Sequence, residues 1–419
     1  MQTATTARAT LQQQRPLLHQ RAAARPLLRG AIRPRVAALD VPTIPKDDDR
    51  TFVRKPDGSF DLSAAPPFSL SDIRDAIPAR CFERSAAKSF AYLAFDVAVV
   101  AGLAAAAFTL NSWFVWPLYW LAQGTMFWAL FVVGHDCGHQ SFSPSRTLND
   151  FVGNIVHASI MVPYHGWRVS HRKHHGNHGH VDNDESWYPT PKSIYDNMDE
   201  LTKLGRMRFP WCLFAYPFYL LRRSPGKSGS HYDPECDLFV PSERNMVLTS
   251  DACLVGMLAV LAACTAKLGV VAMFNLYFVP YWVFVAWLDM VTYLQHHGSN
   301  DPAEKLPWYR GADWSYLRGG LTCLDREYGI FHWLTHNIGT HVVHHLFPQI
   351  PHYNLREATA AVKPVLGPYY REPVPCPPHG IPTQLAEPLV RSFNEDHWVP
   401  DEGTVVFYNR DPEFNVKKA

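Results

Sequence analysis

Four long apolar stretches limit what this chain can fold into more than any other feature. They cover residues 90–110, 113–133, 246–265 and 268–290. Each approaches the roughly 20 residues that a helix needs to cross a bilayer, and only Asp96 interrupts the first of them. Short turns, at Asn111 and Ser112 and at Ala266 and Lys267, join the stretches in pairs. The sequence therefore predicts an all-α integral membrane protein with four transmembrane helices in two hairpins.

Histidines gather in two windows of the chain. Nine of the 21 histidines lie within residues 135–180, and eight more lie within residues 296–352. They form one H-x-x-x-H pattern, at residues 135–139, and two H-x-x-H-H patterns, at residues 171–175 and 341–345. Because residues three and four apart share one face of a helix, each pattern directs at least two imidazoles the same way. A single histidine is more often a surface or hydrogen-bonded core residue, but three such patterns predict a metal site, and imidazole suits iron, copper, zinc and nickel.

The order of spans and histidines predicts on which side of the membrane the metal site lies. The second stretch runs directly into His135, and the fourth runs into His296 and His297. Because two spans separate these points, all three patterns emerge on one face. We expect a histidine-rich helical cap domain there, together with a C-terminal tail, residues 374–419. Lysines and arginines are frequent between the hairpins, and the positive-inside rule places this face in the cytosol or its organellar equivalent.

The N-terminal region differs in composition from the rest of the chain. Residues 1–39 contain seven arginines, no lysine and no acidic residue, which is typical of an organelle transit peptide. A disordered basic tail is the alternative. Residues 40–65 are polar and rich in proline and aspartate, which predicts a flexible linker. The membrane domain is then expected over residues 66–373.

Charge and cysteine usage argue against other protein classes. The formal net charge of +1 and the scattered basic residues give no reason to expect nucleic-acid binding. The eight cysteines contain no C-x-x-C pair and no regular framework, so we interpret them as reduced thiols.

The three histidine patterns, in this order between paired hairpins, resemble the boxes of the membrane-bound acyl-lipid fatty acid desaturases. Three segments resemble most closely the plastid omega-3 desaturases of plants and algae. They are residues 171–187 (H-R-K-H-H-G-N-H-G-H-V-D-N-D-E-S-W), 305–320 (K-L-P-W-Y-R-G-A-D-W-S-Y-L-R-G-G) and 341–352 (H-V-V-H-H-L-F-P-Q-I-P-H). The resemblance covers residues 66–373 and leaves the two ends of the chain unmatched.

This resemblance implies a site of two iron ions held by histidine. Carried over position by position, the ligands are His135, His139, His171, His174, His175, His296, His341, His344 and His345. His297 is the alternative to His296, and His336 is a further candidate. Four acidic residues near the boxes either orient imidazoles through the second ring N–H or belong to solvated loops. They are Asp136, Asp182, Asp184 and Glu185.

The family's chemistry suits such a site. An unactivated C–H bond offers no polar handle to acid or base groups, whereas a diiron site supplied with dioxygen and two electrons can oxidise it. The resemblance implies an omega-3 desaturase that introduces a cis double bond into dienoic 16- or 18-carbon acyl chains of membrane glycerolipids. An omega-6 acyl-lipid desaturase or a fatty acid hydroxylase on the same scaffold is the alternative. In a different class, a metal transporter would place its ligands within broken helices near the bilayer midplane.

The electrons must come from a separate protein. The sequence contains no His-Pro-Gly-Gly haem signature, no glycine-rich flavin or nicotinamide fingerprint and no iron–sulfur cysteine spacing. Together with a transit peptide, resemblance to the plastid members implies ferredoxin as the donor and a chloroplast membrane, envelope or thylakoid, as the location. An endoplasmic reticulum membrane with a cytochrome donor is the alternative, although Lys417 and Lys418 lie one place out of register for a dilysine retrieval signal.

Overall fold

The computed structural model describes residues 52–414 except 59, 62, 299–304 and 378. The predicted transit peptide and the first part of the predicted linker therefore lie outside the described residues. The described part is mostly helical. It also contains one small antiparallel sheet, in which β1, Trp308–Tyr309, pairs with β2, Val405–Val406.

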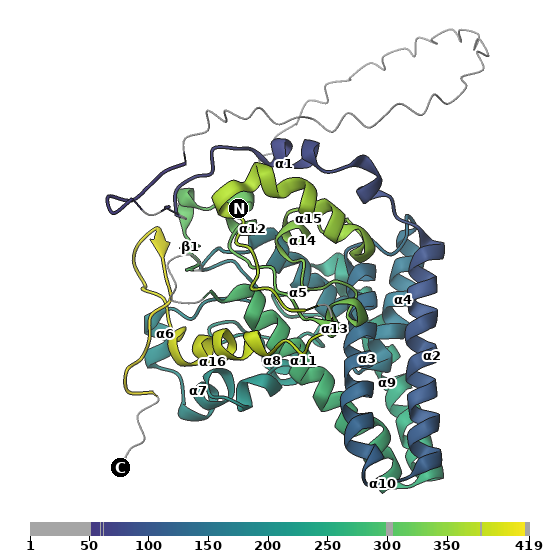
Figure 1. Cartoon of the computed structure of the whole chain (residues 1–419). Coiled ribbons are helices and arrows are strands. Elements are labelled where there is room, and N and C mark those ends of the chain that lie inside the picture. Colours follow the sequence, from purple (N-terminus) through teal and green to yellow (C-terminus); the bar gives the residue numbers. More distant parts are fainter. Residues whose placement is uncertain (1–51, 59, 62, 299–304, 378, 415–419) are drawn as a thin grey trace, which may run out of the picture. The chain divides into compact units, whose positions relative to one another are not determined.

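Long helical segments correspond to the four apolar stretches (Figure 1). They are α2, Ala86–Leu110; α3, Val115–Gly138; α9, Arg244–Leu268; and a composite of α10, Val270–Met273, the π-helical turn η4, Phe274–Phe278, and α11, Val279–His296. By length and composition, three segments of the described chain can cross a membrane: Ala86–Leu110, Pro241–Leu268 and Val270–His296. The second predicted span, α3, is not among them, because tryptophan, tyrosine, proline and glutamine lower its hydropathy.

Other helices, not lipid, surround much of α3. Sixteen of its 24 residues are buried, whereas only three of the 25 residues of α2 are. It packs against α2, against α11 and against the shorter helix α4, Arg146–Ser159. Gly124 permits the close approach of α11, since a Cβ atom at this position would lie 2.4 Å from Cβ of Val283. A helix that is covered by protein can carry polar and amphipathic side chains where their polar atoms find partners.

The turn of the second hairpin differs from the prediction. Ala266 and Lys267 lie within α9, which continues to Leu268 and ends at Gly269. Gly269 has a φ of +87°, a conformation that glycine adopts without steric cost. The turn of the first hairpin is at its predicted place, where Asn111 ends α2 in the left-handed conformation.

The shorter helices gather on the side of the molecule away from α10 (Figure 1). They are α1, Leu70–Ala76; η1, Ala79–Phe82; α4; α5, Tyr164–Asn177; α6, Lys192–Asp196; α7, Glu200–Met207; η2, Trp211–Phe214; α8, Tyr216–Arg222; η3, Pro241–Glu243; η5, Gly311–Asp313; α12, Tyr316–Gly320; α13, Ile330–Leu334; α14, Val342–Leu346; α15, His352–Leu366; η6, Gly367–Tyr369; η7, Thr383–Leu385; and α16, Ala386–Glu395. The residues after 373 contact this region through α16, which packs on α11, and through β2, which pairs with β1.

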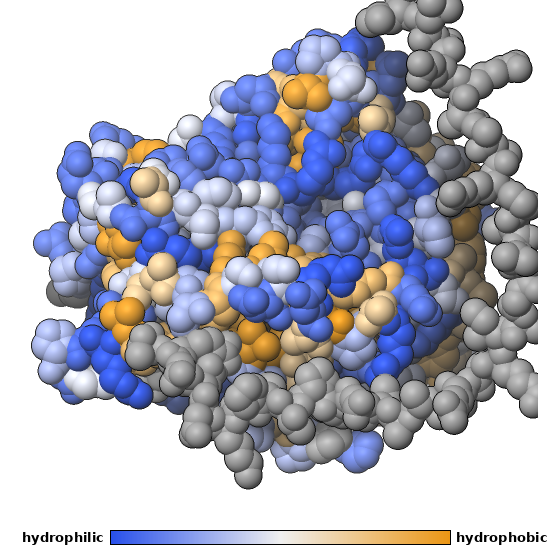
Figure 2. Space-filling view, turned by 90° about the horizontal axis from the view of Figure 1, so that it is seen from above, coloured by the Kyte–Doolittle hydropathy of each residue, from blue (hydrophilic) through white to orange (hydrophobic). Residues whose placement is uncertain are grey.

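The two ends of the molecule differ in surface character. Large apolar side chains project from the long helices; Phe108 on α2 is 53% exposed and Val255 on α9 is 65% exposed. Figure 2, which looks down on the shorter helices, shows a mostly hydrophilic surface. Apolar surfaces of this extent on helices of this length fit a lipid environment.

Candidate metal centre and adjoining cavities

Ten buried or half-buried histidines converge where the shorter helices meet the ends of α3 and α11. His135 and His139 come from the end of α3, and His296 is the last residue of α11. The helix α5 and the residue that follows it contribute His171, His174, His175 and His178. The start and body of α14 contribute His341, His344 and His345. All nine predicted ligands are among these ten residues.

The ten histidines divide into two sets. The first set comprises His135, His139, His171, His175 and His344, whose ligand atoms all lie within 4.8 Å of one another. The second set consists of two groups that share His345, and each group meets the same distance limit. The groups are His174, His178 and His345, and His296, His341 and His345.

Each H-x-x-H-H box contributes to both sets. In the second box, His171 and His175 join the first set and His174 joins the second. In the third box, His344 joins the first set and the two outer histidines join the second. Residues four apart project from the same side of a helix, while the residue between them points elsewhere. One box can therefore serve two metal ions.

Ring nitrogens in the cluster lack ordinary hydrogen-bond partners. Nε2 of His139 and Nε2 of His344 are buried without a partner among the described residues. In the second set, Nε2 of His341 lies 3.1 Å from Nε2 of His296 and 3.0 Å from Nε2 of His345. Buried polar atoms in folded proteins are normally satisfied. Imidazole nitrogens that converge on one another without other partners fit bound metal ions.

Burial favours the neutral form of four histidines of the first set. Loss of hydration lowers the pKa of His139, His171, His175 and His344 well below the ordinary value, and neighbouring imidazoles lower it further. Metal ions bind the neutral form of imidazole. These four residues therefore present free lone pairs at neutral pH.

Asp184 is the acidic candidate that contacts a predicted ligand most closely. Its Oδ1 atom lies 2.8 Å from Nδ1 of His174, which leaves Nε2 of that ring for a metal ion. The same oxygen accepts the backbone N–H groups of Ser186 and Trp187, at 3.1 and 3.0 Å. Because Asp184 is fully buried, this carboxylate has a fixed place in the structure.

Asp136 contacts a histidine outside the cluster. Its Oδ2 atom lies 2.8 Å from Nδ1 of His352 and also accepts the backbone N–H of that residue. Its Oδ1 atom is 3.7 Å from Nδ1 of His135, which is too long for a hydrogen bond. Asp136 therefore joins the end of α3 to the first residue of α15.

The other two acidic candidates are paired with arginines, which agrees with the loop alternative for them. Asp182 has its carboxylate 3.7 Å from Arg310. Glu185 accepts hydrogen bonds from Nε and Nη2 of Arg223, at 2.8 and 2.9 Å. Within the described chain neither carboxylate is hydrogen-bonded to an imidazole of the cluster. These residues hold loops together around the site.

His297 and His336 lie outside both sets. Nδ1 of His297 is 3.0 Å from Oδ2 of Asp396, in the C-terminal tail. Nε2 of His336 is 2.7 Å from Oδ2 of Asp96, the acidic residue within the first span. The geometry therefore favours His296 over His297, because only the former meets other imidazoles through Nε2.

A small cavity, here called the inner cavity, adjoins both sets of histidines. Its volume is about 110 Å³. His135 and His171 of the first set line it, as do His174, His296 and His341 of the second. Its apolar and aromatic lining includes Trp128, Phe131, Trp167, Trp187, Tyr216, Tyr219, Leu288, Tyr293 and Ile338. A mostly apolar cavity beside a metal-binding cluster suits a hydrocarbon chain.

Comparison with known proteins decides the family. The model of the fatty acid desaturase family matches residues 111–374, more than half of the chain. The chain belongs to the fatty acid desaturase family. A second model, of a domain of unknown function, matches residues 19–105. Family membership confirms the resemblance of the histidine boxes and argues against the metal-transporter alternative.

The desaturase is similar over most of its length to plant omega-3 enzymes. A chloroplastic sn-2 acyl-lipid omega-3 desaturase (ferredoxin) of Arabidopsis thaliana is 60% identical over 84% of this chain and 78% of the relative. A chloroplastic omega-3 fatty acid desaturase of Brassica napus is 59% identical over 84% of this chain and 86% of the relative. An endoplasmic reticulum omega-3 fatty acid desaturase of Vigna radiata var. radiata is 56% identical over 85% of this chain and 92% of the relative.

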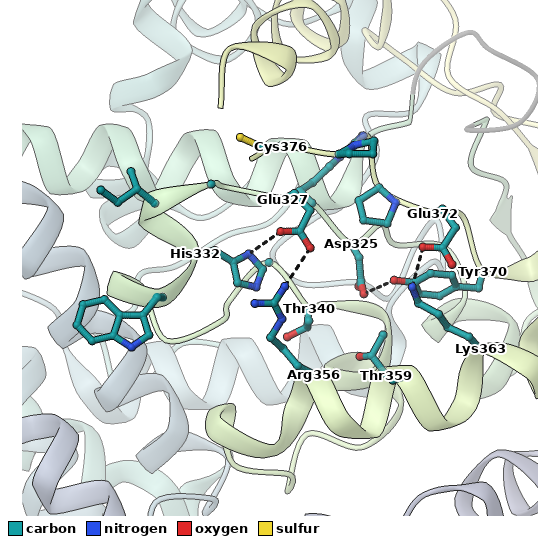
Figure 3. A pocket seen from close by; sticks show the side chains of 18 of the residues that line it. Asp325, Glu327, His332, Thr340, Arg356, Thr359, Lys363, Tyr370, Glu372 and Cys376 are labelled. Atoms are coloured by element: carbon teal, nitrogen blue, oxygen red, sulfur yellow. Dashed lines mark hydrogen bonds and ion pairs between the residues drawn. The ribbon is translucent and has the colours of Figure 1, made fainter. Parts of the chain in front are cut away.

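The desaturase has a second and larger cavity, here called the outer cavity, whose lining includes Thr340, the residue before the third box (Figure 3). Its volume is about 620 Å³. Charged side chains line it in pairs: Glu327 lies 3.5 Å from Arg356, and Lys363 lies 2.6 Å from Glu372. None of the ten clustered histidines is among its described lining residues.

One carboxylate of the outer cavity supports the third box of the desaturase. Oδ1 of Asp325 accepts the backbone N–H groups of His341 and Val342, at 2.6 and 2.8 Å. Its other oxygen accepts the hydroxyl of Tyr370 at 2.8 Å (Figure 3). These bonds fix the start of α14 and thereby the direction of its histidines.

Sequence reasoning missed one member of the cluster, His178. Its side chain is among the buried ones, and burial lowers its pKa to about 3. The spacing from His174 to His178 repeats the H-x-x-x-H pattern of His135 and His139. That repeated spacing is the signal that could have identified it.

Proposed function

We propose that this desaturase introduces the omega-3 cis double bond into dienoic 16- or 18-carbon acyl chains of membrane glycerolipids. The observation that carries this proposal is the inner cavity, an apolar space bordered by histidines of both sets. Its position beside the cluster suits a reaction at one carbon–carbon bond of an otherwise featureless chain. The choice of the omega-3 position is supported by relatives, 60% and 59% identical, that are named omega-3 desaturases.

The cluster suits two iron ions, one for each set. The proposed ligands are the nine histidines expected from the family, and the convergence of their ring nitrogens is supporting evidence. Bound iron, with dioxygen and two electrons, would supply the oxidising power that removes two hydrogens from the acyl chain. Asp184 holds His174 in one tautomer, and the Trp187 ring stacks on His296 with 5.5 Å between centroids. These residues orient the ligands and keep water from the reacting segment.

The proposed four-span membrane domain includes α3 as its second span, in addition to the three segments that are apolar enough to cross a membrane. The helix α3 runs between α2 and α11, and both helices pack against it. With four spans, all three histidine boxes lie on one face of the membrane. We divide the chain into a transit peptide (1–39), a linker (40–65), a membrane desaturase domain (66–373) and a tail on the same face (374–419). Cysteine labelling at Asn111 and Gly269 in sealed vesicles should place both turns on the face opposite the boxes; labelling from different faces would disprove the four-span arrangement.

The proposed electron donor is ferredoxin, and the proposed location is a chloroplast membrane. Relatives from Arabidopsis thaliana and Helianthus annuus carry ferredoxin in their names and are chloroplastic. The related Vigna radiata enzyme of the endoplasmic reticulum keeps that membrane as the second candidate. Import into isolated chloroplasts, with sequencing of the mature N-terminus, tests the location; an N-terminus that remains at Met1 would contradict it.

Fatty acid profiling tests the activity. The full chain is expressed with ferredoxin and its reductase in a host whose lipids contain dienoic chains, and trienoic chains with a new omega-3 double bond are expected. A matched His344→Ala strain should form none. Dienoic chains formed from monoenoic ones would indicate an omega-6 desaturase, and hydroxylated chains would indicate a hydroxylase. Either result without trienoic chains would refute the omega-3 proposal.

A further inference from the structure

His178 is the one histidine of the ten-membered cluster that is not among the nine proposed ligands. It follows α5 directly, and its side chain is 2% exposed. Its ring centroid lies 4.3 Å from that of His345, 4.8 Å from that of His296 and 5.0 Å from that of His174. All three neighbours belong to the second set. His178 therefore lies at the edge of one half of the cluster only.

We propose that His178 is a positioning residue that accepts a hydrogen bond from Nδ1–H of His296 and so directs Nε2 of that ring at the second metal ion. The proposal rests on the proposed function, in which the cluster holds two irons. Nδ1 of His296 lies 3.0 Å from Nε2 of His178. Nε2 of His296 faces the opposite way, 3.1 Å from Nε2 of His341. A ligating histidine usually donates its second ring N–H to such a partner.

The protons of the two rings can be placed consistently with this role. If Nδ1 of His296 carries the proton, Nε2 of His178 must be the acceptor, so the proton of His178 is on Nδ1. That atom is buried and has no hydrogen-bond partner among the described residues, so it does not compete for the contact with His296. The lone pair on Nε2 of His178 is then used by His296, although the ring lies close enough to His174 and His345 to be considered a ligand.

The backbone holds His178 firmly enough to orient another residue. Its carbonyl oxygen accepts the indole N–H of Trp314 at 3.0 Å. Gly319 packs directly on that carbonyl, since a Cβ atom at Gly319 would lie 1.9 Å from the oxygen. The next residue, Gly179, accepts the backbone N–H of Tyr309 at 2.8 Å. His178 thus connects a metal ligand to the segment around residues 309–319.

Two ligands of the second set consequently have different hydrogen-bond acceptors for their second ring N–H. His174 donates to the carboxylate of Asp184, whereas His296 donates to a neutral imidazole. A carboxylate makes an imidazole ligand more basic than a neutral acceptor does. The two ligands would therefore differ in donor strength although both contact the same metal ion.

Iron content and iron spectroscopy of the purified full chain test this role. Four variants are compared with the unaltered chain: His178→Ala, which removes the acceptor; His178→Gln, whose amide oxygen can accept the hydrogen bond; His178→Asp, which can accept it and can also ligate iron; and His180→Ala, a control on the same loop outside both sets. Size-exclusion chromatography and thermal unfolding check that each variant is folded. The affinity for each iron and the Mössbauer spectrum are then measured.

We expect His178→Ala to weaken the binding of one of the two irons by about 10- to 100-fold and to alter one of two Mössbauer signals. His178→Gln should restore most of the affinity, and His180→Ala should leave both signals unchanged. Full iron binding with an unchanged spectrum in His178→Ala would overturn the proposal. Loss of one iron in His178→Gln with retention in His178→Asp would overturn it in favour of direct ligation. If the unaltered chain itself does not bind two irons, the proposed function fails and the role of His178 fails with it.

Discussion

The inner and outer cavities both lie next to the start of the third histidine box, and they differ in both size and chemistry. The outer cavity is the larger, about 620 Å³ against about 110 Å³, and its charged side chains are paired with one another. The inner cavity is mostly apolar and touches histidines of both sets. His341 links them: it lines the inner cavity, and its backbone N–H is bound to Asp325, which lines the outer cavity. Volume is therefore a poor guide to the substrate site here, and the lining is a better one.

The largest expected loss of activity and iron follows the substitution of a clustered histidine, compared with a buried histidine outside both sets. His344→Ala removes a ligand of the first set, so desaturation should fall below detection and iron should be lost. His297→Ala is the matched control, because His297 is buried but bonded to Asp396 outside both sets. Iron per chain and trienoic acid yield measure both effects. Equal iron loss in the two variants would mean that the two sets are not the metal site.

A smaller loss of iron affinity or activity is expected when the carboxylate that orients His174, at the inner cavity, is neutralised. Asp184→Asn keeps the size of the side chain but removes the charge that orients His174, so iron affinity or activity should fall by about 10- to 100-fold. Asp182→Asn is the control on the same loop, since Asp182 is paired with Arg310 outside the cluster. Iron titration distinguishes them. Identical titrations of the Asp184 variant and the unaltered chain would show that this carboxylate has no role in metal binding.

The shape of the inner cavity is tested by Trp187→Phe. The smaller ring leaves space beside His296, on which Trp187 stacks, so the acyl chain should lie less accurately. We expect a loss of roughly tenfold in activity, below the 100-fold that a misplacement of about 1 Å can cause. Positional analysis of the products should also reveal some misplaced double bonds. An unchanged rate and product pattern would exclude Trp187 from contact with the substrate.

The smallest effect is expected at the outer cavity. Glu327→Gln removes the charge that pairs with Arg356, an arginine whose side chain is 60% exposed. Exposed ion pairs contribute about 0–1 kcal/mol to the free energy of unfolding, so the thermal midpoint should move only slightly. Activity should stay within about twofold, as expected for a surface change with little effect on stability. A changed product pattern would show instead that the substrate reaches this cavity.

Helices, turns and histidine boxes that depend on neighbouring residues could be predicted from the sequence. Contacts between residues far apart in the chain could not. The three boxes follow from helical spacing, and the turn at Asn111 follows from residues next to it. The partners of His297 and His336 are Asp396 and Asp96, which lie 99 and 240 residues away along the chain. No pattern around either histidine reveals those contacts. Hydropathy likewise could not show that protein covers α3 on most sides.

His178 shows a different limit of sequence reasoning. Its spacing from His174 was visible, but the resemblance implied ligands only within the boxes and at His296, after the fourth span. The acids of the same loop were equally close in sequence, yet only Asp184 bonds to a box histidine, while Glu185 binds Arg223. Neighbouring residues of a loop point in different directions, and their directions depend on the tertiary contacts of the loop.

The hydrogen bonds of Asp184 have a consequence for how metal loading and lipid binding depend on each other. One oxygen atom holds both His174 and the backbone of Trp187, so a ligand and a wall of the inner cavity are ordered together. If iron ordering this carboxylate favours the bound shape of the cavity, thermodynamic reciprocity requires that the lipid raises the affinity for iron by the same factor. A desaturase in lipid-rich membranes would then retain its iron better than the same chain in detergent.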